Sequence, residues 1–233
     1  MIGGSLGIGR GSISTGHSVP VTDKLILWLR SDLGTEVSSN KVVAWKDQSG
    51  KFISASNTAT SEQPWLSSSA WENWIPTLGF NGKNLLSVNS LSSSVGNYTA
   101  FFIHDRNDTG TDEMFLDVEF GRLVFFADVT NKIGYGTSAA NTGIANNITG
   151  KQYVSYKLDS TNNVASIYRG GSLLGTGTIP SIFIGGRKVL GARFSGGTFA
   201  FSGSMTEVLF YEKILTDNEM SGVHNYIKDR YKL

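Results

Sequence analysis

Short runs in which apolar and polar residues alternate, separated by turn-forming residues, cover most of the chain. In "DKLILWLRSD", Leu25, Leu27 and Leu29 occupy one face of a predicted strand, and Trp28 and Arg30 occupy the other. Comparable runs follow, rich in β-branched and aromatic residues: "KVVAWKD", "YTAFFIHD", "EMFLDVEF", "RLVFFADV", "QYVSYKLD", "NVASIYRGG", "SIFIGG", "TFAFSGS" and "MTEVLFYE". The pattern predicts on the order of ten strands.

The clearest predicted hairpin is "QYVSYKLDSTNNVASIYRGG". Val154, Tyr156 and Leu158 alternate with polar residues, the turn falls in "DSTNN", and Gly170-Gly171 ends the returning strand. Antiparallel neighbours of this kind build meanders and sandwiches. Because strands and helices do not alternate along the chain, a parallel sheet is disfavoured.

The C-terminal residues predict a strand followed directly by a helix. The strand "MTEVLFYE" has apolar residues on both faces, which indicates a covered position in the sheet. Thr216 and Glu219 form a capping box, which marks the start of a helix. Met220, Val223 and Ile227 then form an apolar stripe, so the helix is expected to lie on a sheet.

Several segments together resemble the concanavalin A-like lectin/glucanase sandwich in its laminin-G-like form. They are "LILWLRSDLG", "VVAWKDQSG", "QPWL", "IPTLGFNGKNLLSV", "YVSYKLDSTNNVASIYRGGSLLG" and "FSGSMTEVLFYEKILTDNEMSGVHNYIKDRYKL", and the resemblance covers residues 21–233. It implies an all-β fold, a jelly-roll of two antiparallel sheets with a short C-terminal helix. In that family the concave face or the edge loops often bind glycans, sometimes with calcium. Domains with similar motifs occur in bacterial and phage surface proteins, so the resemblance also implies a phage virion component.

Composition and charge narrow the function classes. With 233 residues, 39% of them hydrophobic, the chain can form one large core, and residues 20–233 are expected to form one domain. Its 20 basic and 19 acidic residues give no reason to expect nucleic acid as a partner, and the absence of cysteine removes disulfides and thiolate chemistry. Without a signal-peptide pattern or a long apolar run, we expect synthesis in the host cytoplasm, no membrane insertion, and a final place in the virion.

Residues 1–19 form a Gly/Ser-rich segment, which we interpret as a docking arm. Its glycines do not form a phosphate loop, because no strand precedes them and no Lys-Ser/Thr follows. The arm is expected to bind other virion proteins, and the subunit is expected to form a homo-oligomer. The docking candidates are Ile2, Leu6, Ile8, Arg10 and Ile13.

Aromatic side chains give the best candidates for binding cell-surface glycans. Trp65, Trp71 and Trp74 lie in "QPWLSSSAWENWIP", a segment too irregular for one strand and flanked by Pro64 and Pro76. Sugar rings stack on flat apolar faces of this kind. The alternative is that the three tryptophans pack in the core or in an interface.

A carboxylate pair raises the alternative of a glycan hydrolase. The related glycanases carry Glu-x-Asp-x-Glu on one strand, whereas "FLDVE" places Phe115 at the first position, before Asp117 and Glu119. The spacing of Asp117 and Glu119 corresponds to about 6.5 Å along a strand, at the lower end of the separation in inverting enzymes. Because the nucleophile position is apolar, we expect a solvated strand face and no enzyme activity.

The remaining polar candidates are weaker. His17, His104 and His224 are scattered over the arm, a strand and the helix, so surface or hydrogen-bonded roles are expected rather than a metal or catalytic set.

The loop "DRNDTGTDE" supplies carboxylate oxygens that suit calcium, although it lacks EF-hand spacing. An ordinary solvated loop is the alternative. The calcium candidates are Asp105, Asp108 and Asp112, and no other cofactor is expected.

The sequence thus favours a non-enzymatic structural or decoration subunit on the surface of a phage capsid or tail, with loops that contact host glycans. The alternative is a stand-alone carbohydrate-binding module, and a weakened glycan hydrolase is the third reading. An aromatic cleft that holds a sugar would favour the second, and a cleft centred on Asp117 and Glu119 would favour the third.

Overall fold

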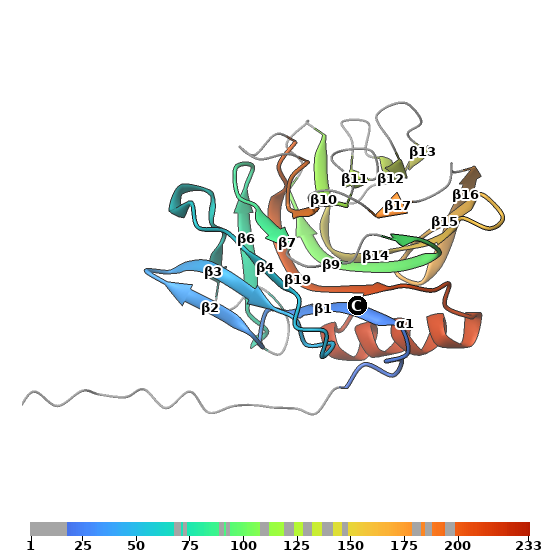
Figure 1. Cartoon of the computed structure of the whole chain (residues 1–233), viewed down its shortest axis with the longest axis horizontal. Coiled ribbons are helices and arrows are strands. Elements are labelled where there is room, and N and C mark those ends of the chain that lie inside the picture. The colour runs from blue at the N-terminus through green and yellow to red at the C-terminus, as the bar shows by residue number, and fades with distance from the viewer. Residues whose placement is uncertain are drawn as a thin grey trace, which may run out of the picture.

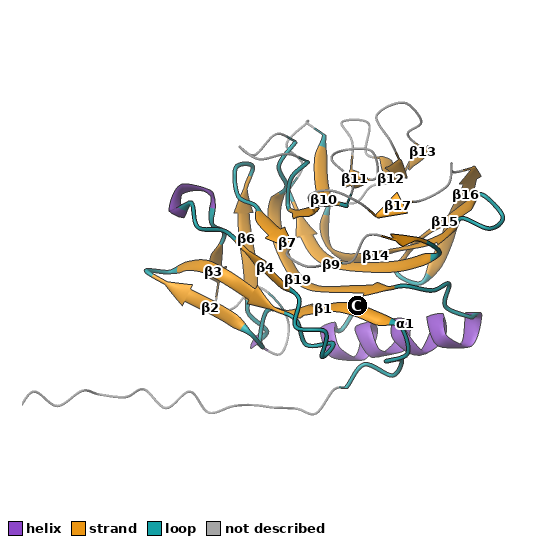
Figure 2. Cartoon of the chain, viewed as in Figure 1, coloured by secondary structure: helices purple, strands orange, loops and turns teal. Residues whose placement is uncertain are grey.

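The computed structural model describes most of the chain from residue 18 onward. The described residues are 18–67, 71, 74–88, 91, 94–107, 112–118, 124–127, 132–136, 142–145, 149–178, 183–184, 188–193 and 199–233. Within them the chain forms two layers of antiparallel strands and a helix near its C-terminus (Figures 1 and 2). This confirms the predicted β-sandwich with a short C-terminal helix.

The first sheet is built around β19 (Ser202–Tyr211). In spatial order it contains β16 (Ser172–Thr178), β15 (Val164–Arg169), β14 (Gly150–Asp159), β9 (Tyr98–Arg106) and β19, followed by β1 (Leu25–Arg30) and β6 (Thr77–Asn81) one after the other along the far side of β19. β19 therefore occupies the interior of the sheet, as its two apolar faces predicted.

The second sheet packs over the first. In spatial order it contains β2 (Thr35–Ser38), β3 (Lys41–Lys46), β4 (Ser54–Ser56), β7 (Leu86–Val88), β18 (Lys188–Leu190), β10 (Glu113–Asp117), β11 (Val124–Ala127), β12 (Lys132–Gly136) and β13 (Thr142–Ala145). β5 (Trp65–Ser67) pairs with both β3 and β6, so it connects the two sheets along one side. The smaller elements are the strand pair β8 (Ser94–Val95) and β17 (Phe183–Ile184), the 3-10 helix η1 (Thr60–Glu62) and the helix α1 (Asp217–Tyr231).

The main core fills the space between the sheets. Alternate residues of the central strands supply it, so that Phe102, Tyr156 and Phe210 are buried there while their neighbours face the other way. Aromatic rings pack edge-to-face and stacked, as Phe102 does on Phe115 at 5.5 Å. The predicted alternation of Val154, Tyr156 and Leu158 is confirmed, since all three side chains lie in this core.

Helix α1 forms a third layer on the outer face of the first sheet (Figure 1). Thr216 Oγ1 accepts a hydrogen bond from the Glu219 amide, and the Glu219 carboxylate accepts one from the Thr216 amide, which confirms the capping box. Met220, Val223 and Ile227 are buried against outward-facing residues of the sheet. The helix therefore gives the first sheet a second covered face and does not close the space between the sheets.

A bulge changes the predicted faces of β1. Its register against β19 shifts between Leu25 and Leu27. Leu27 and Leu29 point into the main core, whereas Leu25 packs on the helix side with Val223, so the prediction that all three leucines share one face is wrong. Within the described ranges, no helix has both the length and the apolar character needed to span a bilayer.

Candidate functional site

A polar recess opens beside β3 and β4. Val42 points into the main core, and its neighbour Val43 lines the recess instead. The volume of the recess is about 440 Å³, within the usual range for small-molecule sites. Its lining residues are Ser38, Ser39, Val43, Ser56, Asn57, Thr58, Thr60 and Gln63.

One wall of the recess is the turn between β2 and β3. Ser39 and Asn40 both have left-handed backbones, with φ of 48° and 64°. Two successive left-handed residues are what a two-residue hairpin turn requires, and asparagine tolerates that conformation well. The turn holds Ser38 and Ser39 at the edge of the recess.

The opposite wall is the segment 57–63, which Asn57 holds in place. Its Nδ2 donates to the carbonyl of Leu85 at 3.1 Å and to Glu62 Oε2 at 3.3 Å, while its Oδ1 accepts from the amide of Ala59 at 2.9 Å. Its carbonyl accepts from Gln63 Nε2 at 2.6 Å. These contacts fix the shape of the segment although it lies outside the sheets.

The lining can pair with groups that both donate and accept hydrogen bonds. It contains five hydroxyls and two carboxamides, and each hydroxyl or carboxamide offers both functions. No carboxylate, imidazole or ammonium group lies among the eight lining residues. The described lining residues thus offer neutral groups that both donate and accept hydrogen bonds, as the hydroxyls of a polyhydroxylated ligand do.

Trp65, a sequence candidate, lies next to this recess. Trp65 is opposite Lys41 across β5 and β3, and Lys41 Nζ lies 5.9 Å from the centre of the indole ring. The same ammonium donates to the carbonyl of Gln63, a lining residue, at 3.4 Å. The ring lies over Gly79, where an added Cβ would come within 2.2 Å of it, so glycine is required there.

The other two tryptophans lie elsewhere. Trp71 is buried in the helix layer, with its ring 5.2 Å from that of Tyr231 in an edge-to-face contact, so the packing alternative describes it. Trp74 is 79% exposed and has a left-handed backbone with φ of 59°, an unusual conformation for an aromatic residue. The three tryptophans therefore do not form one aromatic cleft.

Of the candidate carboxylate pair, the described member Asp117 is not exposed to solvent. Phe115 and Leu116 are adjacent, yet both lie in the main core, because the register of β10 shifts between Met114 and Leu116. Asp117 is fully buried beside Val189 of β18, and Glu119 lies outside the described residues.

The calcium candidates are only partly described. Asp105 and Asp112 are half-buried and Asp108 lies outside the described residues. Burial raises the pKa of Asp105, and the nearby Lys151 opposes that shift. Among the residues that the structure describes, no three acidic or histidine side chains gather as metal ligands would.

His104 departs from the surface or hydrogen-bonded role expected for it. It is fully buried on β9, with its ring centre 4.8 Å from that of Phe115, and neither ring nitrogen has a hydrogen-bond partner among the described residues. Burial, with the neighbouring Arg106 charge, lowers the pKa of His104 to about 3. Nearby, Arg106 and Glu113 form an ion pair that is itself fully buried.

His224 is the better satisfied histidine. Its Nε2 lies 3.3 Å from Ser155 Oγ in the helix layer, and burial, with Lys228 nearby, lowers its pKa to about 4. Since Ser155 is fully buried, this pair fixes α1 on the sheet and is not a nucleophile–base pair open to substrate. His17 and the arm candidates Ile2, Leu6, Ile8, Arg10 and Ile13 lie outside the described residues.

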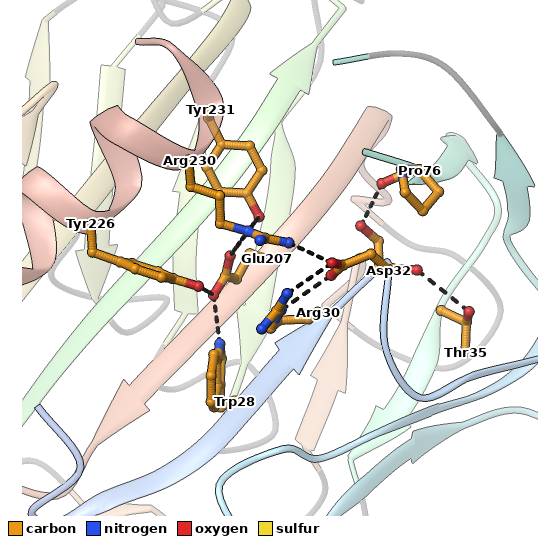
Figure 3. A network of polar contacts seen from close by, with 10 residues as sticks. Trp28, Arg30, Asp32, Thr35, Pro76, Glu207, Tyr226, Arg230 and Tyr231 are labelled. Atoms are coloured by element: carbon orange, nitrogen blue, oxygen red, sulfur yellow. Dashed lines mark hydrogen bonds and ion pairs between the residues drawn. The ribbon is translucent and has the colours of Figure 1, made fainter. Parts of the chain in front are cut away.

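A second polar cluster, around Glu207, joins α1 to the first sheet (Figure 3). The buried Glu207 carboxylate accepts hydrogen bonds from Trp28 Nε1, Tyr226 and Tyr231, and it pairs with Arg230 at 3.3 Å. Four donors therefore converge on one carboxylate, which leaves it satisfied by the protein itself.

The Arg230 guanidinium continues this cluster to Asp32 at 2.7 Å, and Arg30 binds the same carboxylate through Nε and one terminal nitrogen (Figure 3). Burial opposes ionisation of Asp32, but the two guanidinium groups outweigh it and lower its pKa. These ion pairs hold helix α1 against the first sheet.

Sequence reasoning missed both polar groupings. The recess residues are turn and loop residues, and nothing in their spacing distinguishes them from other Ser/Thr/Asn-rich loops in this chain. A signal for the second cluster was present, because Glu207 lies in the strand predicted to have two covered faces. A buried carboxylate requires partners, and the tyrosines of the following helix are within reach.

Comparisons with known proteins agree with this architecture. The binding domain of Paraclostridial Mosquitocidal Protein 1 is similar with a TM-score of 0.63 and 11% identity over 88% of this chain and 52% of that one, so this chain spans about half its length. A second similar structure is domain 4 of AbnA, an extracellular GH43 arabinanase from Geobacillus stearothermophilus, in complex with arabinotriose. Its TM-score is 0.62 and its sequence identity is 15%, over 86% of this chain and 98% of that one. Trypanosoma rangeli sialidase in complex with sialic acid is similar with a TM-score of 0.60 and 15% sequence identity. The match covers 91% of this chain and 34% of the sialidase chain.

This chain has an antiparallel β-sandwich fold. The identities are too low for the likeness to establish more than the fold. No protein-family model matches the sequence, and no curated protein matches it.

Proposed function

We propose that this protein is a non-catalytic carbohydrate-binding domain whose site is the polar recess together with the adjacent Trp65. The observation that carries the proposal is the lining of the recess, which offers hydroxyls and carboxamides and no carboxylate. A sugar presents hydroxyls that donate and accept, and such a lining matches them without charged groups.

The neighbourhood of the recess supports this assignment. The half-buried Trp65 adds apolar surface beside the recess, and a sugar that contacted its ring would share it with Lys41. The similar domain of the arabinanase was determined with arabinotriose bound, which makes a sugar a reasonable ligand for the same architecture. Asp117, the described member of the alternative carboxylate pair, is fully buried and is not among the residues that line the recess, which favours binding without hydrolysis.

A blocked recess tests the proposal. Val43→Phe places a larger side chain in the floor of the recess on a strand that tolerates aromatic residues. We expect the wild-type protein to bind members of a glycan array and Val43→Phe to lose that binding by about tenfold or more. Val164→Phe on β15 is the matched control, because it makes the same change at an exposed valine outside the recess.

The array also separates binding from hydrolysis. Release of reducing ends from any bound glycan would contradict a non-catalytic role. Equal binding by wild-type protein and a folded Val43→Phe variant would move the site away from the recess, and Trp74 would then be the next residue to substitute.

A laminin-G-like subunit on a phage particle is the wider context that the sequence motifs suggest. In that role the recess would meet host glycans while residues 1–19 dock on other virion proteins or on further copies of the subunit. Deletion of residues 1–17 tests this role separately: loss of binding to purified phage particles, with glycan binding retained, would support it. If the deletion left binding to the particles unchanged, or if the full chain itself did not bind them, the result would count against the phage-particle role.

A further inference from the structure

We propose that the recess selects neutral sugars and discriminates against sugars that carry a carboxylate. This inference rests on the proposed function and names the ligand class of the same site. None of the eight described residues that line the recess carries a charged side chain.

The charged side chains that flank the recess are equal in number for each sign, and each one already contacts another protein group. Lys41 donates to the Gln63 carbonyl and lies over the Trp65 ring, while Glu62 accepts from Asn57. On the neighbouring strands, Lys46 and Glu36 form a second, exposed pair. The described residues that flank the recess therefore carry two ammonium groups and two carboxylates, and none of these four residues is among the eight that line it.

A carboxylate entering this recess would lose water and meet no cation among the eight lining residues, since the nearby Lys41 is already held by the Gln63 carbonyl and the Trp65 ring. Ionised groups that leave water require a charged partner, whereas a sugar hydroxyl needs hydrogen bonds that neutral groups supply. The lining offers these neutral partners at five hydroxyls and two carboxamides. The balance of the two effects favours the neutral sugar over its acidic counterpart.

The same argument predicts a weak dependence on salt. Binding through neutral hydrogen bonds and ring contacts is not screened by ions, whereas recognition of an acidic glycan by a basic site is. Affinity for a neutral ligand should therefore change little between about 50 and about 500 mM salt.

Matched pairs of oligosaccharides test the inference on the full chain. We would measure binding of galactotriose against trigalacturonic acid, of mannotriose against trimannuronic acid, and of lactose against sialyllactose. The variants are Val43→Phe, which blocks the recess, Thr58→Lys, which adds a cation to its exposed wall, and Thr22→Lys, which adds the same charge at an exposed threonine outside it.

We expect at least one neutral sugar to bind, and its acidic partner to bind at least about tenfold more weakly. Thr58→Lys should reduce this difference in affinity, whereas Thr22→Lys should leave it unchanged. An acidic member that binds as tightly as its neutral partner, in a manner lost in Val43→Phe, would overturn the neutral class while the carbohydrate-binding function stands. Failure of every member of the three pairs and of a broad glycan array to bind would overturn the proposed function and this inference with it.

Discussion

The hydroxyl of Tyr226 donates a hydrogen bond of 2.8 Å to Oε1 of Glu207, which joins the helix to the strand at the interior of the first sheet. Burial, with the charge of Glu207 adding to it, raises the pKa of Tyr226 well above its usual range, which favours the protonated phenol that donates this hydrogen bond. This hydrogen bond is one of several that the buried Glu207 carboxylate accepts. Its loss should therefore lower the free energy of unfolding.

Glu207→Gln should lower the free energy of unfolding by about 3 to 5 kcal/mol, because the amide removes the negative charge that Arg230 faces in a buried site. Urea unfolding followed by circular dichroism measures the change. Glu36→Gln is the control, since it breaks an exposed ion pair with Lys46 and should cost less than about 1 kcal/mol. Equal effects of the two variants would contradict the structural role of the Glu207 cluster.

The tryptophans that the sequence grouped together should behave differently. Trp71→Ala removes a buried ring from the helix layer and should cost about 3 to 5 kcal/mol of stability. Trp74→Ala changes an exposed side chain and should stay within about 0.5 kcal/mol of the wild type. Thermal unfolding of both variants checks the contrast, and a strongly destabilised Trp74 variant would contradict the exposed position.

Acid should destabilise the fold through its two buried histidines. Their folded-state pKa values of about 3 and about 4 lie below the unfolded value of about 6.5, so the unfolded chain binds protons first as the pH falls. Stability is therefore complete above pH of about 6.5 and declines below it, by about 1.4 kcal/mol per pH unit for each histidine.

His104→Phe isolates one of these contributions. The substitution keeps a ring among Phe115 and Phe201 and removes the titrating group. At pH of about 5 the wild type should lose about 2 kcal/mol through this residue relative to pH 7, and the variant should not. Urea unfolding of both proteins at the two pH values measures the difference, and parallel losses would show that His104 does not titrate on unfolding.

The capping box gives a local test of α1. Thr216→Ala should lower the free energy of unfolding by about 1 kcal/mol, because the Glu219 amide loses its acceptor. Ser221→Ala, at an exposed position inside the same helix, should be neutral or slightly stabilising, since alanine has the higher helix propensity. A Thr216 variant as stable as the Ser221 variant would mean that tertiary packing alone sets the helix start.

Periodicity and capping chemistry predicted most of the architecture because both are local properties. The alternation around Tyr156 and the Thr216–Glu219 pair each lie within a few residues, and the structure confirms both. The predicted alternation of buried and exposed faces was wrong in two strands that contain β-bulges, β1 and β10. The extra residues near Leu25 and Phe115 shift the faces of two strands, and such irregularities depend on the partner strand.

The candidate site could be predicted only in part, because it is assembled from separate loops. Trp65 was identified as a flat ring near a turn, and it lies beside the recess. The recess itself depends on the meeting of the 38–40 turn with the 57–63 segment, which Asn57 anchors to the Leu85 carbonyl across a long stretch of sequence. Hydrogen bonds of that range leave no periodic signal in the chain.

The position of β19 has a consequence for how the molecule is made. β19 pairs with β1, β6 and β9, so residues as far apart as Leu25 and Tyr211 must meet before the first sheet is complete. On the ribosome, β9, β14, β15 and β16 can pair with one another, whereas β1, β6 and one edge of β9 lack their β19 partner until residue 211 has emerged. Nascent chains that stall before β19 are therefore the species most exposed to aggregation and to capture by chaperones.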